Sequence, residues 1–238
     1  MTRIAILEAG HPPRSLQPRF GCYPAMFEAL LGGDAVERSY DVTRGELPAR
    51  PEDHGAYLIT GSSAGVYDDR PWIDPLKQFL VAAKSKAKLV GICFGHQIMA
   101  EAFGGRVEKS VKGWGIGLQD YRLSAHPAWT AGETEVAVPV CHQDQVVVQP
   151  PATCLIGGND FCPIGILAYQ DQPAMSVQFH PEFEPAFASA LIDLLEDEAV
   201  DPEAAKASLE QPNDRQRVAG WIRDFADESS SSSMAFSK

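Results

Sequence analysis

The sequence predicts an α/β fold in which an open, mostly parallel β-sheet is covered by helices on both faces and continues into an antiparallel β extension. Two observations carry this prediction. Up to residue 103, short apolar strand-type segments alternate with amphipathic helix-type segments, as in a parallel sheet with helices on both faces. From residue 115 to residue 168, strand-type segments follow one another with little helix between them, which favours antiparallel pairing.

Apolar periodicity, together with Gly and Pro at the ends of segments, places the elements in order. In the first half, strands are expected at residues 3–7, 36–42, 57–60 and 89–92, and helices at residues 24–31, 71–84 and 96–103. In the second half, strands are expected at residues 116–123, 135–140, 146–148, 153–156 and 164–169, and a helix at residues 185–196. This order predicts a three-layer, flavodoxin-like arrangement.

The chain is expected to contain one main domain at residues 1–198, which is long enough to bury a sizeable core. Residues 199–228 are predicted to form an acidic helical extension, with Trp221 and Phe225 on the face that docks. The Ser-rich tail at residues 229–238 has the low complexity of a disordered segment.

The composition is that of an ordinary soluble acidic protein. Hydrophobic residues make up 45% of the chain and its formal net charge is −12, which argues against a nucleic-acid partner or an anionic membrane surface. The N-terminus begins a strand without a signal-type apolar region, and no apolar run approaches the length of a membrane span. The five cysteines show neither paired spacing nor the C-x-x-C spacing of a metal site. We therefore expect a cytoplasmic protein without a cofactor or a metal.

Cys93 lies in a motif typical of a nucleophile. An apolar strand-type segment runs directly into Gly91-x-Cys93-x-Gly95, and a helix-type segment follows without a loop. In enzymes with a G-x-S-x-G motif, this strand–turn–helix arrangement carries the reactive serine. Glycines on both sides let strand and helix approach closely around a strained central residue, and the helix N-terminus favours the reactive thiolate. A buried core cysteine is the alternative, which the two flanking glycines disfavour.

A second apolar strand leads to His180, which is followed by Pro181 and Glu182. A thiol nucleophile needs a histidine as base and a third group that holds this histidine in the correct tautomer. Cys93, His180 and Glu182 can fill these three roles. A His-Pro-Glu tripeptide alone would indicate a surface turn, but here it follows a strand in a chain that also carries the cysteine motif.

With these two motifs, the chain resembles the class I, triad-type glutamine amidotransferases, and among them the glutaminase domain of GMP synthase and its stand-alone relatives. The resemblance implies that Cys93 attacks the side-chain amide of glutamine. A γ-glutamyl thioester forms, ammonia leaves, and water then releases glutamate. It also implies that the backbone N–H groups of Ser62 and Phe94 bind the oxyanion, although family members commonly have Gly and Pro where Ser62 and Ser63 stand.

The same resemblance implies four contacts with the glutamine substrate. Gln97 lies one helical turn after the cysteine on the same helix face, and Gly61 belongs to the oxyanion turn. Trp114 lies in a Gly-rich segment that would pass beside the substrate carboxylate, and Gln143 lies in a turn that would face the glutamine pocket. For the Gly-rich segment, a β-bulge or a hairpin entry is an equally good interpretation.

Two other histidines adjoin these motifs. His142 is a rival for the role of the base, but nothing near it in the sequence can orient its ring as Glu182 can orient that of His180. His96, the neighbour of Gln97, should point away from the thiol and serve packing.

Three functions remain open. The first, which we favour, is a glutamine amidotransferase that releases ammonia to an acceptor on a partner synthetase. The partner is expected because the chain lacks the G-x-x-x-x-G-K-[ST] nucleotide motif that an ATP-dependent amination would use. The second is a stand-alone γ-glutamyl hydrolase or peptidase with the same three residues. The third is a non-catalytic binding module that keeps the fold without turnover.

Overall fold

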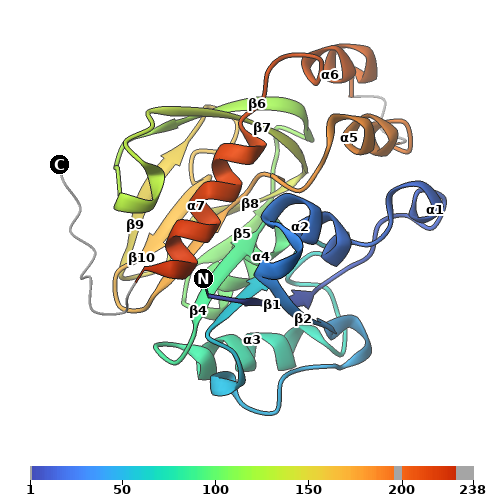
Figure 1. Cartoon of the computed structure of the whole chain (residues 1–238). Helices are drawn as coiled ribbons and strands as arrows, with labels where there is room; N and C mark the ends of the chain where they lie inside the picture. Colours follow the sequence, from blue (N-terminus) through green and yellow to red (C-terminus); the bar gives the residue numbers. More distant parts are fainter. Residues whose placement is uncertain (1, 196–199, 229–238) are drawn as a thin grey trace.

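A nine-stranded mixed sheet forms the centre of the protein, and helices cover both of its faces (Figure 1). The computed structural model describes residues 2–195 and 200–228. Its strand order is β2-β1-β3-β4-β11-β10-β9-β6-β7. The disordered tail expected at residues 229–238 and the domain boundary expected at residue 198 lie outside the described residues.

One half of the sheet consists of parallel strands: β2 (Val36–Asp41), β1 (Ile4–Glu8), β3 (Ala56–Ile59), β4 (Lys88–Ile92) and β11 (Ala174–Val177). Apart from β2 at the edge, every residue of these strands is buried. Strands that are covered on both faces read as continuous apolar runs rather than as alternating ones. The parallel sheet predicted from these runs is confirmed.

The other half of the sheet is antiparallel, as the sequence predicts. It consists of β10 (Ile166–Tyr169), β9 (Thr153–Gly158), β6 (Gly115–Leu123) and β7 (Glu135–His142). Because β10 pairs with β11, the antiparallel half continues directly from the parallel half.

One expected strand lies outside the main sheet. The strand expected at residues 146–148 was predicted to belong to the antiparallel extension, but β8 (Asp144–Val148) pairs with β5 (Arg106–Lys109) in a separate two-stranded sheet. No strand was expected at β5. Both strands pack against helix α4, where Val107 and Val146 are buried in the same apolar cluster. Burial of these two valines explains why the chain leaves the main sheet here.

Two helices cover each face of the sheet. On one face lie α2 (Tyr23–Leu31) and α7 (Arg215–Asp227), which contribute Phe27 and Trp221 to the larger apolar cluster. On the other face lie α3 (Ile73–Ala83) and α4 (Phe94–Ala102), which pack against each other and bury Leu76 and Met99. This is the three-layer arrangement that the alternating pattern predicts.

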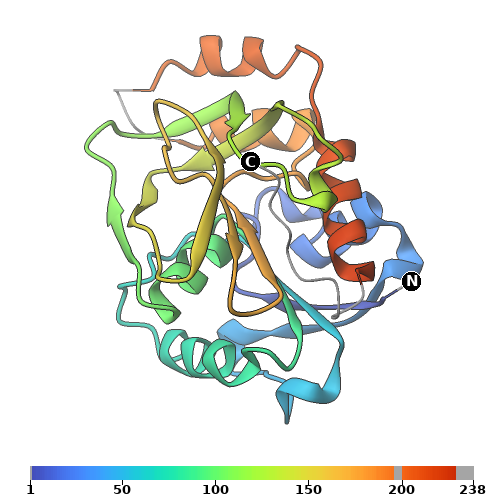
Figure 2. The same ribbon diagram turned by 90° about the vertical axis from the view of Figure 1, so that its left-hand side faces the viewer.

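Two further helices lie beside the antiparallel strands. Helix α5 (Pro185–Ile192) contacts β6 and β7, and α6 (Pro202–Ser208) lies across the end of β6 (Figure 2). The short helix α1 (Gln17–Phe20) lies in a segment where no helix was expected, and Phe20 packs edge-on against Phe187 of α5. Short 3-10 helices lie at Gly33–Ala35, Val42–Arg44, Pro51–Asp53 and Ala128–Thr130. No helix among the described residues combines the length and apolar character needed to cross a bilayer.

Candidate active site

Cys93 occupies the sharp turn between strand β4 and helix α4. Its φ is 51° and its ψ is −101°, a left-handed conformation that side-chain-bearing residues rarely adopt. Such strain costs on the order of 1–3 kcal/mol and is held only where the surroundings determine it. Here the Cys93 N–H donates to the Val177 carbonyl of the neighbouring strand at 2.9 Å. The turn therefore fixes Cys93 between the end of β4 and the N-terminus of α4.

The two glycines that flank Cys93 are required by close packing. A Cβ atom at Gly91 would lie 2.6 Å from the Gly95 carbonyl oxygen and 2.7 Å from Met99 Sδ. A Cβ atom at Gly95 would lie 2.3 Å from the carbonyl oxygen of Ile59 in β3. These distances are far below van der Waals contact, so the helix can approach the sheet this closely only with glycine at both positions.

The structure brings Cys93, His180 and Glu182 together. Strands β4 and β11 are parallel neighbours, so the residues that follow them meet at the same edge of the sheet. Cys93 and His180 both line the same cavity, and Cys93 is close enough to the ring for its charge to raise the pKa of His180. On the other side of the ring, Nδ1 of His180 donates to Glu182 Oε1 at 2.8 Å. All three side chains are buried, and Glu182 is in contact with the histidine rather than with solvent.

The charges of this cluster change the protonation of His180. Burial by itself would lower the pKa of the ring, because it removes the imidazolium ion from water. The negative charges of Cys93 and Glu182, and their hydrogen bonds to the ring, outweigh burial and raise the pKa of His180 from 6.5 to about 10. A protonated ring beside a thiolate is the arrangement that can attack a carbonyl and then give a proton to a leaving amine.

The His180 ring is fixed by its neighbours. Phe183 stacks on the ring with centroids 3.8 Å apart and an interplanar angle of 5°. Gly61 lies so close to His180 Cε1 that a Cβ atom would be 2.7 Å away. Arg215 at the start of α7 donates to the carbonyl oxygens of Pro181, at 2.8 Å, and Glu182, at 3.4 Å. The C-terminal helix therefore supports the backbone that carries the histidine and the glutamate.

Sequence reasoning missed Gln178. This fully buried side chain donates from Nε2 to Cys93 Sγ at 3.4 Å, and its Oε1 accepts from Gln97 Nε2 at 3.2 Å. Gln97 Nε2 also donates to the Asp144 carbonyl at 2.9 Å. The sequence does contain a signal for it, because Gln178 is a polar residue in the otherwise apolar segment that leads to His180. An amide buried there must find hydrogen-bond partners.

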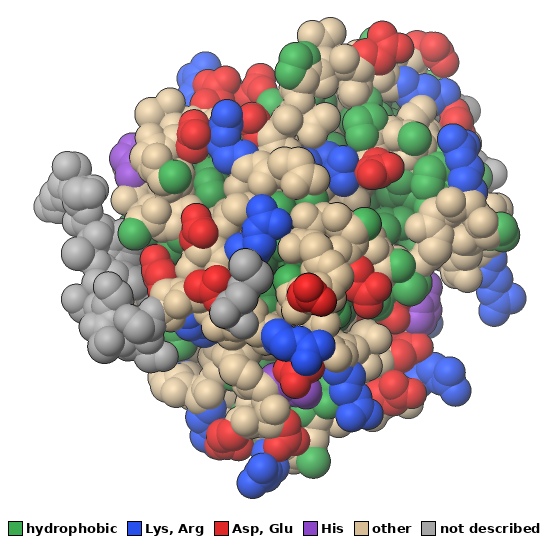
Figure 3. Space-filling model, in the orientation of Figure 1, with side chains coloured by type: hydrophobic (Ala, Val, Ile, Leu, Met, Phe, Trp, Pro, Cys, Tyr) green, Lys and Arg blue, Asp and Glu red, His purple; other side chains and the backbone are tan. Residues whose placement is uncertain are grey.

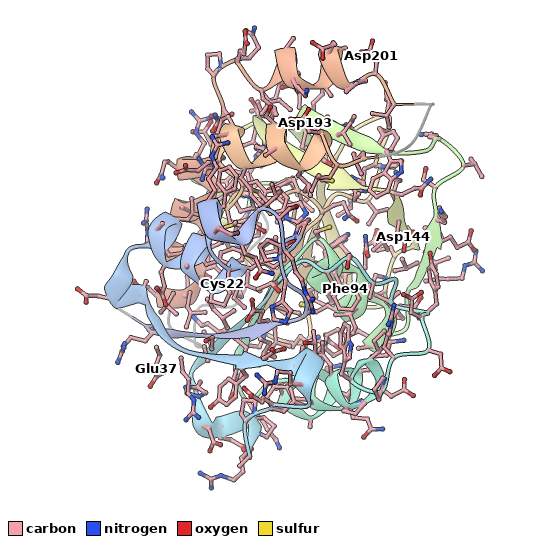
Figure 4. All side chains as sticks on the ribbon, turned by 90° about the vertical axis from the view of Figure 1, so that its right-hand side faces the viewer. Cys22, Glu37, Phe94, Asp144, Asp193 and Asp201 are labelled. Carbon is pink, nitrogen blue, oxygen red and sulfur yellow. The ribbon has the colours of Figure 1, made fainter. Side chains whose placement is uncertain are left out.

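A cavity of about 510 Å³ opens over Cys93 and His180. The residues expected to bind substrate or oxyanion that line the cavity are Ser62, Gln97, Trp114 and Gln143. Glu182 and Gly61 lie behind His180 instead, and Phe94 faces the core against Trp72, with ring centroids 5.4 Å apart. Figure 4 labels Phe94 of α4 and Asp144 of β8, two elements that pack against each other beside the cavity.

The two expected oxyanion positions differ in how they present their backbone. Phe94 is the first residue of α4, so its N–H has no carbonyl within the helix to which it can donate. Ser62 follows β3 and lines the cavity, and its Oγ accepts from the Ala64 N–H at 3.1 Å. Both positions adjoin the nucleophile candidate, one in sequence and one across the cavity.

Neither rival histidine has a carboxylate partner like that of His180. His142 lines the cavity, but its Nδ1 bonds to the Asp144 carbonyl at 3.1 Å, and burial lowers the pKa of its ring to about 3. His96 is fully buried between Ser176 Oγ, at 2.8 Å, and the Ile164 carbonyl, at 3.0 Å, and burial lowers the pKa of its ring to about 4. His96 therefore serves packing, as the sequence predicts.

A second, smaller cavity of about 230 Å³ lies on the far side of Glu182. Figure 3 shows hydrophobic side chains gathered between α5 and α1, where Phe20 and Phe187 pack with centroids 5.3 Å apart. Arg215 lines this cavity as well. Within residues 2–195 and 200–228, no group of three or more His, Cys, Asp or Glu side chains is arranged to hold a metal ion.

Comparison with known proteins identifies the family. The model for glutamine amidotransferase class-I matches residues 63–192, more than half of the chain. Gamma-glutamyl peptidase 2 of Arabidopsis thaliana is 28% identical over 239 residues, which cover 94% of this chain and 95% of the peptidase. GMP synthase of Thermus thermophilus is 34% identical over 160 residues, which cover 66% of this chain and 28% of the synthase.

A solved structure shows the same fold. The crystal structure of a glutamine amidotransferase from Thermotoga maritima superimposes with a TM-score of 0.76 and 19% sequence identity, covering 96% of this chain and 100% of that one. Fold and family model agree, and the protein belongs to the class-I glutamine amidotransferase family.

Proposed function

We propose that this protein hydrolyses the γ-amide bond of glutamine or of another γ-glutamyl compound, with Cys93 as the nucleophile. The observation that carries the proposal is the position of Cys93. It stands in a strained turn at a cavity that His180 also lines, and Nδ1 of His180 is held by Glu182 at 2.8 Å. A thiolate, a proton donor and a group that orients the donor are what acyl transfer to cysteine requires.

The proposed reaction has two steps. Cys93 Sγ bonds to the amide carbonyl carbon of the γ-glutamyl group (Cδ), the bond from this carbon to nitrogen breaks, and the nitrogen leaves with a proton from His180. Water then gives a proton to His180 and attacks the γ-glutamyl thioester, which releases glutamate and restores Cys93. In both steps the backbone N–H groups of Ser62 and Phe94 would bind the oxyanion that forms on the γ-carbonyl.

The glutamyl part of the substrate would bind on the side of Gln97, Trp114 and Gln143, which line the cavity. Gly61 would act indirectly, because it packs against the His180 ring and leaves it room. The hydrogen-bonded chain from Asp144 through Gln97 to Gln178 then links the substrate side of the cavity to the nucleophile.

Two forms of this function differ in what receives the nitrogen. In the first, a partner synthetase accepts the ammonia released from glutamine, as the name of the Thermus thermophilus GMP synthase suggests. In the second, the protein acts alone as a γ-glutamyl hydrolase or peptidase. The second is supported by the extent of the alignment within this chain, since 94% of the chain aligns with Gamma-glutamyl peptidase 2 and 66% with the synthase.

Glutamate release by the purified protein tests the proposal. Glutamine and γ-glutamyl dipeptides are supplied separately, and each is compared with the Cys93→Ala variant, which removes the nucleophile and little volume. We expect glutamate from at least one substrate with the unaltered protein and none with the variant. Glutamate release at an equal rate by both proteins, or by neither, contradicts the proposal and favours a non-catalytic binding module.

A further inference from the structure

We infer that the preferred substrates are γ-glutamyl amides or peptides whose amine part carries an apolar side chain. This inference rests on the proposed function and names the substrate class of the same site. It follows from the two walls of the cavity over Cys93, which differ in chemistry, and from the position of His180 between them.

One wall of the cavity is polar. Lys109, Asp68 and Asp144 supply charges of both signs, and Gln143 and Trp114 complete this side. An amino acid head group carries one ammonium and one carboxylate, and groups of both signs can bind the two together. This wall therefore suits the glutamyl half of the substrate, which is common to every γ-glutamyl compound.

The other wall is apolar and begins at the proton donor. Phe183 is stacked on His180 at 3.8 Å, and Tyr23 lies over Phe183 with centroids 6.0 Å apart. The wall continues along the C-terminal end of α5 and the N-terminal loop through Leu191, Leu194, Leu195 and Pro13. Leu194 is 45% exposed and lines the cavity, so its apolar surface is open to water or to a ligand.

The chemistry of the reaction places the leaving group against this apolar wall. His180 must stand within hydrogen-bond reach of the departing nitrogen to give it a proton. Whatever is bonded to that nitrogen must therefore lie beside His180, where Phe183 stacks on the ring and where Leu191 of α5 belongs to the same apolar cluster as Phe183. An apolar side chain on the amine would cover this surface and remove it from water.

Ammonia as the leaving group would leave this wall unused. The cavity volume of about 510 Å³ lies within the range of roughly 300–1,000 Å³ that is typical of sites for ligands larger than a single amino acid. His11 also lines the cavity on the loop side, but its ring nitrogens are engaged by Glu8 Oε1, at 3.2 Å, and Asp41 Oδ2, at 3.3 Å. A charged or strongly polar amine would therefore find poor partners on this wall.

The first experiment compares leaving groups on the unaltered protein. The value of kcat/KM is measured for γ-glutamyl-leucine, γ-glutamyl-phenylalanine, γ-glutamyl-glycine, γ-glutamyl-glutamate and glutamine. We expect the leucine and phenylalanine compounds to exceed the glycine compound by about tenfold or more, which is the discrimination that one apolar side chain in a pocket provides. Equal or higher kcat/KM for the glycine compound or for glutamine overturns the inference, while the proposed function stands.

The second experiment assigns the preference to the wall. Leu194→Ser and Leu191→Ser should each lower the ratio of kcat/KM for γ-glutamyl-leucine over γ-glutamyl-glycine, by about fivefold to tenfold. The control is Val81→Ser on α3, a side chain of similar exposure, 50%, on the opposite part of the fold, and it should leave the ratio unchanged. Melting temperatures show that each variant is folded.

The outcomes separate the two proposals. If the ratio of kcat/KM for γ-glutamyl-leucine over γ-glutamyl-glycine is high and stays unchanged in both leucine variants, the apolar wall is not the cause of the preference. The absence of Cys93-dependent hydrolysis of every compound overturns the proposed function and this inference with it.

Discussion

Gln178 donates a hydrogen bond to the sulfur atom of Cys93, 85 residues away in the sequence, at 3.4 Å. The same amide accepts from Gln97, so the nucleophile candidate is hydrogen-bonded to a buried amide that is itself held in place. A donor at this position can stabilise the negative charge that a sulfur nucleophile carries when it attacks.

Replacing this amide should reduce the reactivity of Cys93. In Gln178→Met, which keeps the volume but not the donor, we expect the rate of alkylation of Cys93 by iodoacetamide at neutral pH to fall by about tenfold, the equivalent of one hydrogen bond to a charged group. The rate is measured by mass spectrometry of the Cys93 peptide. Gln149→Met, which removes a half-buried amide that bonds Thr153 away from the cavity, is the control. An unchanged rate in Gln178→Met would show that this contact is only structural.

The pH dependence of turnover should report the pKa of His180. Because this pKa is raised from 6.5 to about 10, the ring stays protonated at neutral pH and loses its proton as the pH rises through about 10. We therefore expect kcat/KM to fall on the alkaline side near that pH. Glu182→Gln removes one of the two negative neighbours of His180 and so lowers the pKa of its ring. The fall of kcat/KM at high pH should therefore occur at a pH that is lower by about one unit or more.

The same shift has a consequence for stability. Between pH 6.5 and about 10 the folded protein binds a proton at His180 that the unfolded chain does not bind. The contribution of this ring to the free energy of unfolding is therefore complete below about pH 6.5 and is lost as the pH rises through about 10. Urea unfolding across this range, in the unaltered protein and in His180→Gln, measures the difference. An identical pH profile for both proteins would contradict the raised pKa.

Gly95→Ala should damage both the fold and the turn that carries Cys93. The added Cβ atom would lie 2.3 Å from the Ile59 carbonyl oxygen, so α4 must move away from β3. We expect the free energy of unfolding to fall by about 2–4 kcal/mol, as for other overpacked buried positions. Gly220→Ala in α7 is the matched control, because no atom lies within 4 Å of its added Cβ atom. It should raise stability by about 0.5–1 kcal/mol, through the better helix propensity of alanine.

Trp221→Ala tests our proposal that the extension at residues 199–228 folds together with the domain at residues 1–198. Trp221 is buried in the main apolar cluster and packs edge-on against Trp129, with ring centroids 5.8 Å apart. Removing such a side chain costs about 3–5 kcal/mol, and we expect this loss in a single unfolding transition. Val111→Ala, at a fully exposed position, should have no effect. A separate low-stability transition in Trp221→Ala would show that the extension unfolds on its own.

The features that the sequence predicts well are those fixed by neighbouring residues. The parallel strands are continuous apolar runs because both of their faces are buried. The turn around Cys93 can be predicted because the two glycines that close packing requires, Gly91 and Gly95, are only four residues apart in the sequence. His180 and Glu182 are two residues apart, so their contact is also local. Helix α7 is predicted by the helical spacing of Trp221 and Phe225, which places both on one face.

Contacts between distant segments were decided only by the tertiary structure. Strand β5 pairs with β8 because Val107 and Val146 reach the same side of α4, and no local pattern records that pairing. The bond from Gln178 to Cys93 depends on β11 lying next to β4.

The two walls of the cavity have the same origin. Lys109 and Leu194 come from segments far apart in the chain, and the fold brings both to the lining of the cavity over Cys93. The sequence by itself therefore determined the buried parallel strands, the strained turn and the reactive residue types, because these follow from local sterics and burial. The tertiary structure decided which side chains surround the nucleophile, because that depends on strand order and on how the helices pack on the sheet.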